Sequence, residues 1–143
     1  MNHQFHTLKG YEIQEHKRIT YAMEDYLEMI CRLGAEQEYV RVGDLAGKLN
    51  VKASSVSKMI GNLKRAGMVE YEKYGLVRPT EKGAELGKYL IYRHNVLTNF
   101  LCFINGTEDE LEQVEKIEHY MNEQTVRNIE RFYNHMTGKS RRF

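Results

Sequence analysis

The chain has 143 residues, of which 41% are hydrophobic, and its formal net charge is +1. This length allows one domain, or two very small ones, with a sizeable core. A single proline and the absence of tryptophan favour helices over a turn-rich β architecture. No apolar run is long enough for a signal peptide or a membrane span, which predicts a cytoplasmic protein without a membrane partner. Cys31 and Cys102 lack CxxC spacing and are expected to be small core residues.

The charges are distributed unevenly along the chain. Residues 52–65 contain Lys52, Lys58, Lys64 and Arg65 but no acid. Residues 108–118, by contrast, contain six carboxylates and a single lysine. One segment is therefore basic and another acidic, which a net charge near zero conceals.

The first half of the chain shows the pattern of a helix-turn-helix with a wing. After a polar arm over residues 1–18, apolar residues at helical spacing predict a helix that ends near Gly34. Two short helices follow, over about 42–49 and from about Ser54 to Gly67, and a tight turn joins them. Two β-prone runs around Lys73-Tyr74-Gly75 then predict a small hairpin, the wing of a winged helix.

The second half is expected to be helical. Thr80 is placed to cap a long helix that ends before Asn105, and a further helical segment is expected from Thr107 to Met121. Asn122 is placed to cap a last helix, to about Tyr133, and the tail GKSRRF is expected to be frayed. The predicted fold class is mainly α: an N-terminal winged helix-turn-helix domain with a small β-hairpin wing over residues 1–80, and a helical domain over residues 81–143.

The second helix of the motif carries the residues expected to contact DNA. Polar side chains near its start are of the kind that reach bases and phosphates in a major groove, and a wing adds contacts to the backbone. A structural three-helix unit without DNA contacts is the alternative. The candidate DNA-binding residues are Lys52, Ser54, Ser55, Ser57, Lys58, Lys73, Tyr74 and Arg78.

Polar side chains interrupt two apolar stripes of the second half. Glu118 falls on the stripe of Leu111, Val114 and Met121, and His94 interrupts the apolar stripe of the long helix. A buried carboxylate without a partner is unfavourable by several kcal/mol or becomes neutral. The two interruptions therefore predict a shared partner that compensates their polarity.

Further donors are expected near these two residues. Glu115 and His119 lie on the same side of the helix as Glu118, and Asp25 and Glu28 lie at the edge of the apolar stripe of the first helix. Four carboxylates and two imidazoles suit Mn²⁺, Fe²⁺, Co²⁺ or Zn²⁺ better than copper, and six donors can hold more than one ion. A core histidine and solvated acidic helix faces are the alternatives.

With these motifs, the chain resembles the diphtheria-toxin-repressor family from about Tyr21 to Tyr133, and within it the manganese-responsive branch. The resemblance rests on MEDYLEMI, SSVSKMI, EKYGLV, YRH and KIEHY. Iron-responsive members resemble this chain but have methionine in place of Asp25 and cysteine in place of Glu115, so harder oxygen donors are present here. His3, His6 and His16 of the arm have no counterpart in the family pattern. The resemblance implies metal ligands at Asp25, Glu28, His94, Glu115, Glu118 and His119.

The expected function is a manganese-dependent DNA-binding repressor of metal-uptake genes, with the metal as co-repressor. The expected partners are a double-stranded DNA operator and a second copy of the chain, with no small-molecule substrate. The resemblance implies two Mn²⁺ ions per subunit, for which Fe²⁺, Co²⁺, Zn²⁺ or Cd²⁺ can substitute. The chain has no HExxH, GxSxG or GxGxxG motif and is not expected to be an enzyme. The alternatives are a binuclear carboxylate/histidine metalloenzyme and a winged-helix protein that senses no metal.

Overall fold

The computed structural model describes residues 7–8 and 19–138, without the side chain of Lys73. Six α-helices and one small antiparallel sheet lie within these ranges, which confirms the mainly α prediction. Most of the predicted arm, including His3, His6 and His16, lies outside the described residues, as does the tail from residue 139 onward. In the described ranges, no helix has both the length and the apolar character needed to span a membrane.

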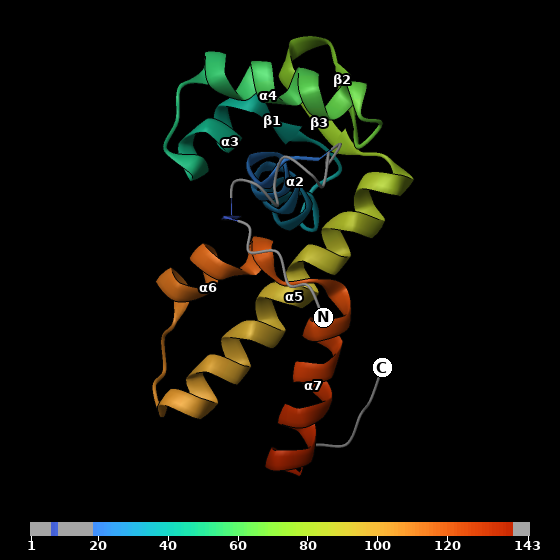
Figure 1. Ribbon diagram of the computed structural model, residues 1–143. Coiled ribbons are helices and arrows are strands. Elements are labelled where there is room, and N and C mark those ends of the chain that lie inside the picture. Colours follow the sequence, from blue (N-terminus) through green and yellow to red (C-terminus); the bar gives the residue numbers. More distant parts are fainter. Residues whose placement is uncertain (1–6, 9–18, 139–143) are drawn as a thin grey trace.

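The first part of the described chain is a winged helix-turn-helix (Figure 1). Asn50 has a left-handed backbone conformation, with φ of 55°, which makes the turn between α3 and α4 tight. The predicted wing is present, because β2 and β3 pair in an antiparallel register that places Tyr71 opposite Val77. The elements are α2 (Tyr21–Gly34), β1 (Val40–Arg41), α3 (Val42–Leu49), α4 (Ala53–Arg65), β2 (Val69–Glu72) and β3 (Leu76–Pro79).

A two-residue strand, β1, joins this hairpin and makes it a three-stranded sheet in the order β1-β3-β2. Val40 pairs with Val77, and both side chains are fully buried. The predicted inward residues of α4, Val56, Ile60 and Leu63, are also fully buried. They pack with Leu27, Ile30 and Leu45 in one hydrophobic core, so α2 packs against the other elements of the winged helix.

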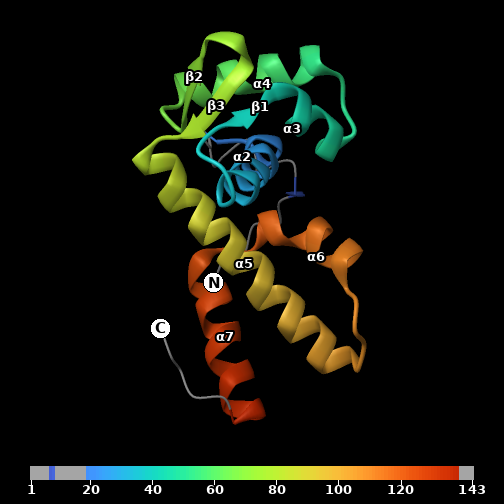
Figure 2. The same ribbon diagram turned by 180° about the vertical axis from the view of Figure 1, so that it is seen from behind.

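The second part consists of α5 (Glu81–Asn105), α6 (Leu111–Ile117), a 3₁₀ turn (Glu118–Tyr120) and α7 (Glu123–Thr137). As predicted, Thr80 caps α5, because its hydroxyl accepts a hydrogen bond from the amide of Gly83, and Asn122 caps α7 in the same way. Figures 1 and 2 show α5 running from the end of the wing to the far end of the molecule. It contacts α2 as well as α6 and α7, and thereby joins the two parts.

The segment after α5 differs from its prediction. The helix expected from Thr107 begins at Leu111, because Thr107 and Asp109 form local side-chain hydrogen bonds, to Glu110 and to the amide of Leu111, that compete with helix formation. It ends at Ile117, so Glu118 lies in a 3₁₀ turn instead of on a continuous helix. Leu111 is 53% exposed and is not a core residue.

Two further details also differ. The helix α7 continues to Thr137, beyond the end predicted near Tyr133. Cys31 and Cys102 are free thiols of intermediate exposure, so they border the core instead of lying fully inside it.

The start of α5 lies directly against the backbone at the start of the wing. A Cβ atom at Gly83 would overlap the carbonyl oxygen of Met68, and one at Gly87 would overlap the thiol of Cys31. Glycine is therefore required at both positions for α5 to pack this closely. This contact fixes the angle at which α5 leaves the winged helix.

We expect Gly83→Ala to lower the free energy of unfolding by about 1–3 kcal/mol, the usual effect of overpacking, because the Met68 carbonyl belongs to backbone and cannot turn away. The matched control is Gly47→Ala, where a Cβ atom meets nothing within 4 Å and alanine should stabilise α3 by about 0.5–1 kcal/mol. Urea denaturation of the metal-free protein measures both changes. Equal midpoints for Gly83→Ala and the wild type would contradict the packing described here.

Candidate metal centre and nucleic-acid interface

Carboxylates and histidines from four segments meet between the winged helix and the second part of the chain. Two sets of donors have ligand atoms that all lie within 4.8 Å of one another. The first set combines Asp25 of α2 with Glu118 and His119 of the 3₁₀ turn. The second set combines His94 of α5 with Glu115 of α6 and, again, Glu118.

Glu118 is the centre of this arrangement. Its side chain is 1% exposed, and its Oε2 lies 3.2 Å from Nδ1 of His94. The other oxygen, Oε1, is 3.9 Å from Nε2 of His119 and is buried without a hydrogen-bond partner among the described residues. A buried carboxylate oxygen in this state is costly unless a cation compensates it, so the site fits a metal ion.

His119 is held from three sides. Its Nε2 lies 2.9 Å from Oδ1 of Asp25, its Nδ1 lies 2.8 Å from Oε1 of Glu24, and its ring stacks on Tyr21. The carboxylate of Glu24 can only accept a hydrogen bond, whereas the guanidinium of Arg93, which can only donate, also lies 3.3 Å from Nδ1. This leaves Nε2 directed toward Asp25 and Glu118, which is how outer carboxylates orient histidine ligands in metal sites.

Arg93 and Glu24 are two site residues that the sequence analysis missed. The guanidinium of Arg93 is nearly fully buried and donates to Oε1 of Glu24 at 3.4 Å. Arg93 stands three residues after Leu90 and four before Leu97, on the buried side of α5. A cation on an apolar stripe is the same signal that singled out His94, so the pattern was available in the sequence.

Glu28 is the predicted ligand that the structure places in neither set. Its Oε2 accepts from Nε of Arg32 at 2.9 Å, one turn further along α2. The other five predicted ligands all belong to at least one set.

The environment shifts the pKa values of the donors. Burial lowers the pKa of His119, but the hydrogen bonds to Asp25 and Glu24 outweigh it and raise the pKa to about 9. The hydrogen bond to Glu118 raises the pKa of His94 against the effect of burial. Burial, followed by the charge of Glu118, raises the pKa of Glu115. The site is thus crowded with negative charge that protonated histidines partly balance.

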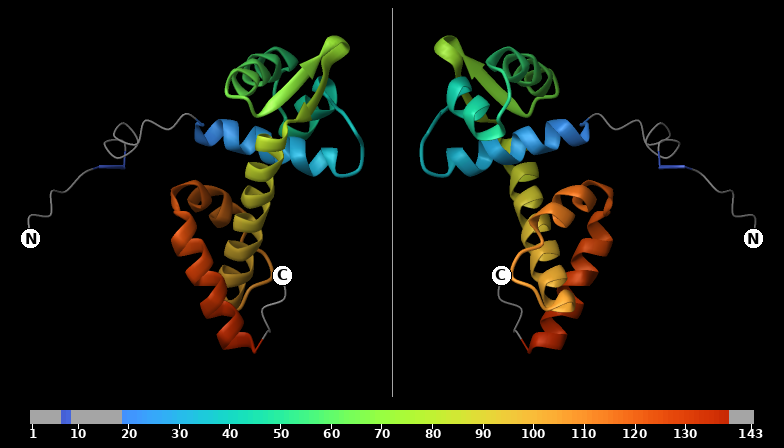
Figure 3. Two further views of the ribbon diagram at one scale, coloured as in Figure 1. Left: turned by 90° about the vertical axis from the view of Figure 1, so that its right-hand side faces the viewer. Right: turned by 90° about the vertical axis from the view of Figure 1, so that its left-hand side faces the viewer.

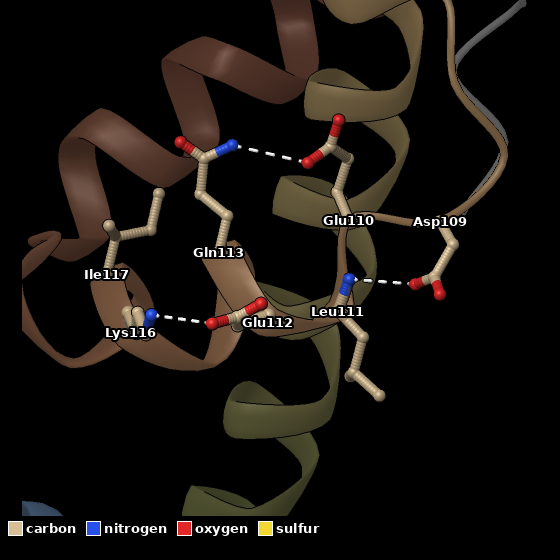
Figure 4. Close-up of a pocket in the computed structure, with 7 residues that line it drawn as sticks. All are labelled: Asp109, Glu110, Leu111, Glu112, Gln113, Lys116 and Ile117. Carbon is tan, nitrogen blue, oxygen red and sulfur yellow. Dashed lines mark hydrogen bonds and ion pairs between the residues drawn. The ribbon is translucent and has the colours of Figure 1, made fainter.

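A separate open hollow lies beside α6 and contains none of the six candidate ligands (Figure 4). Its polar side chains are engaged locally: Lys116 pairs with Glu112, and Gln113 donates to Glu110. Its lining residues are Asp109, Glu110, Leu111, Glu112, Gln113, Lys116 and Ile117.

The helix α4 and the wing, which carry most of the predicted DNA-binding residues, lie at the opposite end of the molecule from the C-terminal ends of α5 and α7 (Figure 3). Tyr74, at the tip of the wing, is 91% exposed. Arg78 is engaged within the sheet, because it pairs with Glu70 at 2.7 Å and stacks over Tyr39, and the side chain of Lys73 is not described. The exposed residues at the start of α4 are Lys52, Ser54, Ser55, Ser57 and Lys58.

A winged helix with an exposed polar and basic helix, joined by one long helix to a partly buried carboxylate and histidine cluster, defines a metal-responsive DNA-binding regulator. Residues 18–77 match the iron dependent repressor N-terminal DNA binding domain, and residues 80–141 match the iron dependent repressor metal binding and dimerisation domain. The chain belongs to the iron dependent repressor family.

Several named proteins are similar to this chain. The HTH-type transcriptional regulator MntR of Bacillus subtilis (strain 168) is 41% identical over 111 residues, which cover 77% of this chain and 78% of that protein. The MntR of Geobacillus kaustophilus (strain HTA426) is 43% identical over 103 residues, covering 71% and 73%. These relatives are transcriptional regulators, so the metalloenzyme alternative is set aside.

Solved structures agree with this assignment. The T. acidophilum IdeR has a TM-score of 0.63 at 30% identity, with 76% of this chain and 53% of that chain covered. The manganese regulator SloR has a TM-score of 0.67 at 28% identity, with 78% and 53% covered. The present chain therefore spans about half the length of these two solved chains.

The stability of the metal-free protein should fall with rising pH where His119 titrates. Its pKa is raised from 6.5 to about 9, so the stabilisation by its charged form is complete below pH 6.5 and is lost as the pH rises through about 9. Urea denaturation between these pH values measures the slope, and His119→Gln should reduce it. An unchanged slope in that variant would show that His119 does not exchange its proton in this range.

Proposed function

We propose that this chain is a manganese-dependent repressor of metal-uptake genes that binds its operator when the metal site is filled. The observation that carries the proposal is Glu118, a buried carboxylate shared by two donor sets, one oxygen of which has no hydrogen-bond partner in the part of the chain that the structure describes. Family membership supplies the regulatory class, and the donor chemistry supplies the choice of metal. Nitrogen and oxygen donors without a thiolate suit Mn²⁺, although Fe²⁺, Co²⁺, Zn²⁺ and Cd²⁺ are able to bind such ligands.

Two ions per subunit fit the two donor sets. In this proposal, Asp25, Glu118 and His119 hold one ion, whereas His94, Glu115 and Glu118 hold the other and Glu28 completes it. Glu118 is able to serve both because its two oxygens face different histidines.

The ligands explain how the metal controls DNA binding. Bound Mn²⁺ supplies the positive charge that the crowded carboxylates lack. Asp25 and Glu28 belong to α2, which packs beneath α4, whereas the other ligands belong to α5, α6 and the 3₁₀ turn. When these donors share a cation, they fix α2 against α5 and thereby fix the orientation of α4.

The two parts of the chain divide the work in this proposal. Residues 1–80 contact DNA, through the exposed start of α4 and the wing, and residues 81–143 bind metal and form a homodimer. Apolar side chains at the far end support the dimer, since they are 43–54% exposed: Phe103, Ile104, Leu111, Phe132 and Met136. A two-fold dimer presents two copies of α4 to inverted half-sites in the cytoplasm, where the operator lies.

Selection from a random duplex library tests the proposed function. We expect the protein with Mn²⁺ to enrich a palindromic duplex, and a chelator to abolish binding to that duplex. Binding that is equally strong without any metal would refute the co-repressor role, and the absence of enrichment would refute the DNA-binding role.

We expect Lys58→Ala to weaken binding to the selected duplex and to leave Mn²⁺ affinity unchanged, because Lys58 is exposed on α4 and distant from Glu118. If it contacts a phosphate, the slope of log K against log salt should fall by about one unit. The control is Lys116→Ala, which removes an exposed lysine from α6. Equal salt slopes for both variants and the wild type would place the DNA contact elsewhere.

The double variant Asp25→Met/Glu115→Cys should lose Mn²⁺ response more than Fe²⁺ or Co²⁺ response. It replaces hard oxygen donors by sulfur, and Mn²⁺ stands lowest in the general affinity order and gains least from sulfur. Duplex affinity is measured anaerobically against each metal at fixed salt, with Glu112→Cys, an exposed position on α6, as control. A full Mn²⁺ response with no gain for Fe²⁺ or Co²⁺ would exclude Asp25 and Glu115 as ligands.

A further inference from the structure

A salt bridge at the edge of the second donor set is not explained by the proposed function. Both Nε and Nη2 of Arg32 lie 2.9 Å from the same oxygen of Glu28, so the guanidinium grips a single carboxylate oxygen. The two partners differ in exposure: the side chain of Glu28 is 12% exposed and that of Arg32 is 38% exposed. Arg32 thus reaches from the surface to a buried carboxylate.

Glu28 is close enough to the second donor set for the charges of Glu118 and His94 to shift its pKa. Burial raises the pKa of Glu28 and Arg32 lowers it, while the charge of Glu118 raises it and that of His94 lowers it. The backbone of α2 keeps Glu28 one turn from Asp25, on the side that faces α5. The carboxylate of Glu28, a proposed metal ligand, is therefore already paired with the guanidinium of Arg32.

Arg32 occupies lone-pair positions of one oxygen of Glu28, so a metal ion that binds this carboxylate must use the other oxygen or compete with the guanidinium. A guanidinium remains charged at every physiological pH, so the competition does not disappear by deprotonation. Its positive charge also opposes a second cation nearby. For the metal-free protein the pair is favourable, because an ionised carboxylate at a buried position requires a counter-charge.

We propose that Arg32 sets the metal affinity of the second donor set by holding Glu28 until a divalent cation displaces it. The inference rests on the proposed function and concerns the regulation of the same site. The set of Asp25, Glu118 and His119 has no guanidinium on Asp25 among the described residues; there Nε2 of His119 lies 2.9 Å from Asp25. Arg32 therefore acts on the second set, with His94 and Glu115, which fills at a higher metal concentration than it would without the guanidinium.

The test compares Mn²⁺ binding of the wild type, Arg32→Gln and a matched control, using the electron paramagnetic resonance signal of free Mn²⁺. We expect two ions per subunit in the wild type, and in Arg32→Gln one site tightened on the order of tenfold, because a positive charge beside a proposed ligand has been removed. The control is Arg127→Gln, which breaks a pair with Glu123 at the same four-residue spacing on the exposed side of α7. It should change neither site.

A double-variant cycle separates the effect of the salt bridge between Arg32 and Glu28 on metal affinity from the general effect of the Arg32 charge. In a Glu28→Gln background, the further change Arg32→Gln should no longer tighten either site. Arg32→Met, a neutral side chain of similar length, should repeat the gain of Arg32→Gln and serves if that variant does not fold.

The outcomes are distinct. Unchanged affinity in both folded Arg32 variants overturns the inference while leaving the proposed function intact. An equal gain in Arg127→Gln, or a gain that persists without the Glu28 carboxylate, also overturns it, because Arg32 then acts only through its charge. A wild type that binds no Mn²⁺ refutes the proposed function itself.

Discussion

The burial of the Glu118 carboxylate between two histidines is the constraint on which the rest of this structure depends. A buried negative charge requires compensation, and the two histidines beside it come from α5 and from the turn that carries Glu118, while α2 and α6 add the carboxylates of Asp25 and Glu115. Each of these segments must hold its position for the donors to meet. The cluster therefore links the part that faces DNA to the part that is expected to form the dimer.

In the metal-free protein, cations of the chain itself balance this negative charge. Arg93 supports Glu24, Arg32 holds Glu28, and the raised pKa values of His94 and His119 favour their charged forms. In the proposed mechanism, a divalent ion replaces the protons on these histidines and competes with the guanidinium of Arg32. Such an exchange changes which segments are tied together, which suits a regulatory switch.

Much of the fold follows from local sequence patterns. Apolar residues at helical spacing predicted α2 to α5, and Thr80 and Asn122 marked the helix starts because their side chains cap amides only a few residues away. The short strand β1 could not be predicted, since two residues carry no periodicity and the strand exists only through its pairing with β3. The end of α6 at Ile117 was missed because a continuous stripe was assumed through Glu118.

The sequence by itself determined the kinds of donor present and the helices that carry them, because polar residues on apolar stripes are visible in a linear pattern. Only the tertiary structure decided how they are divided. In the folded chain, Glu118 belongs to both donor sets. Glu24 contacts His119, 95 positions away in the sequence, and Glu28 pairs with Arg32. Local spacing shows which side of a helix a residue occupies, but contacts between distant segments depend on how the helices pack.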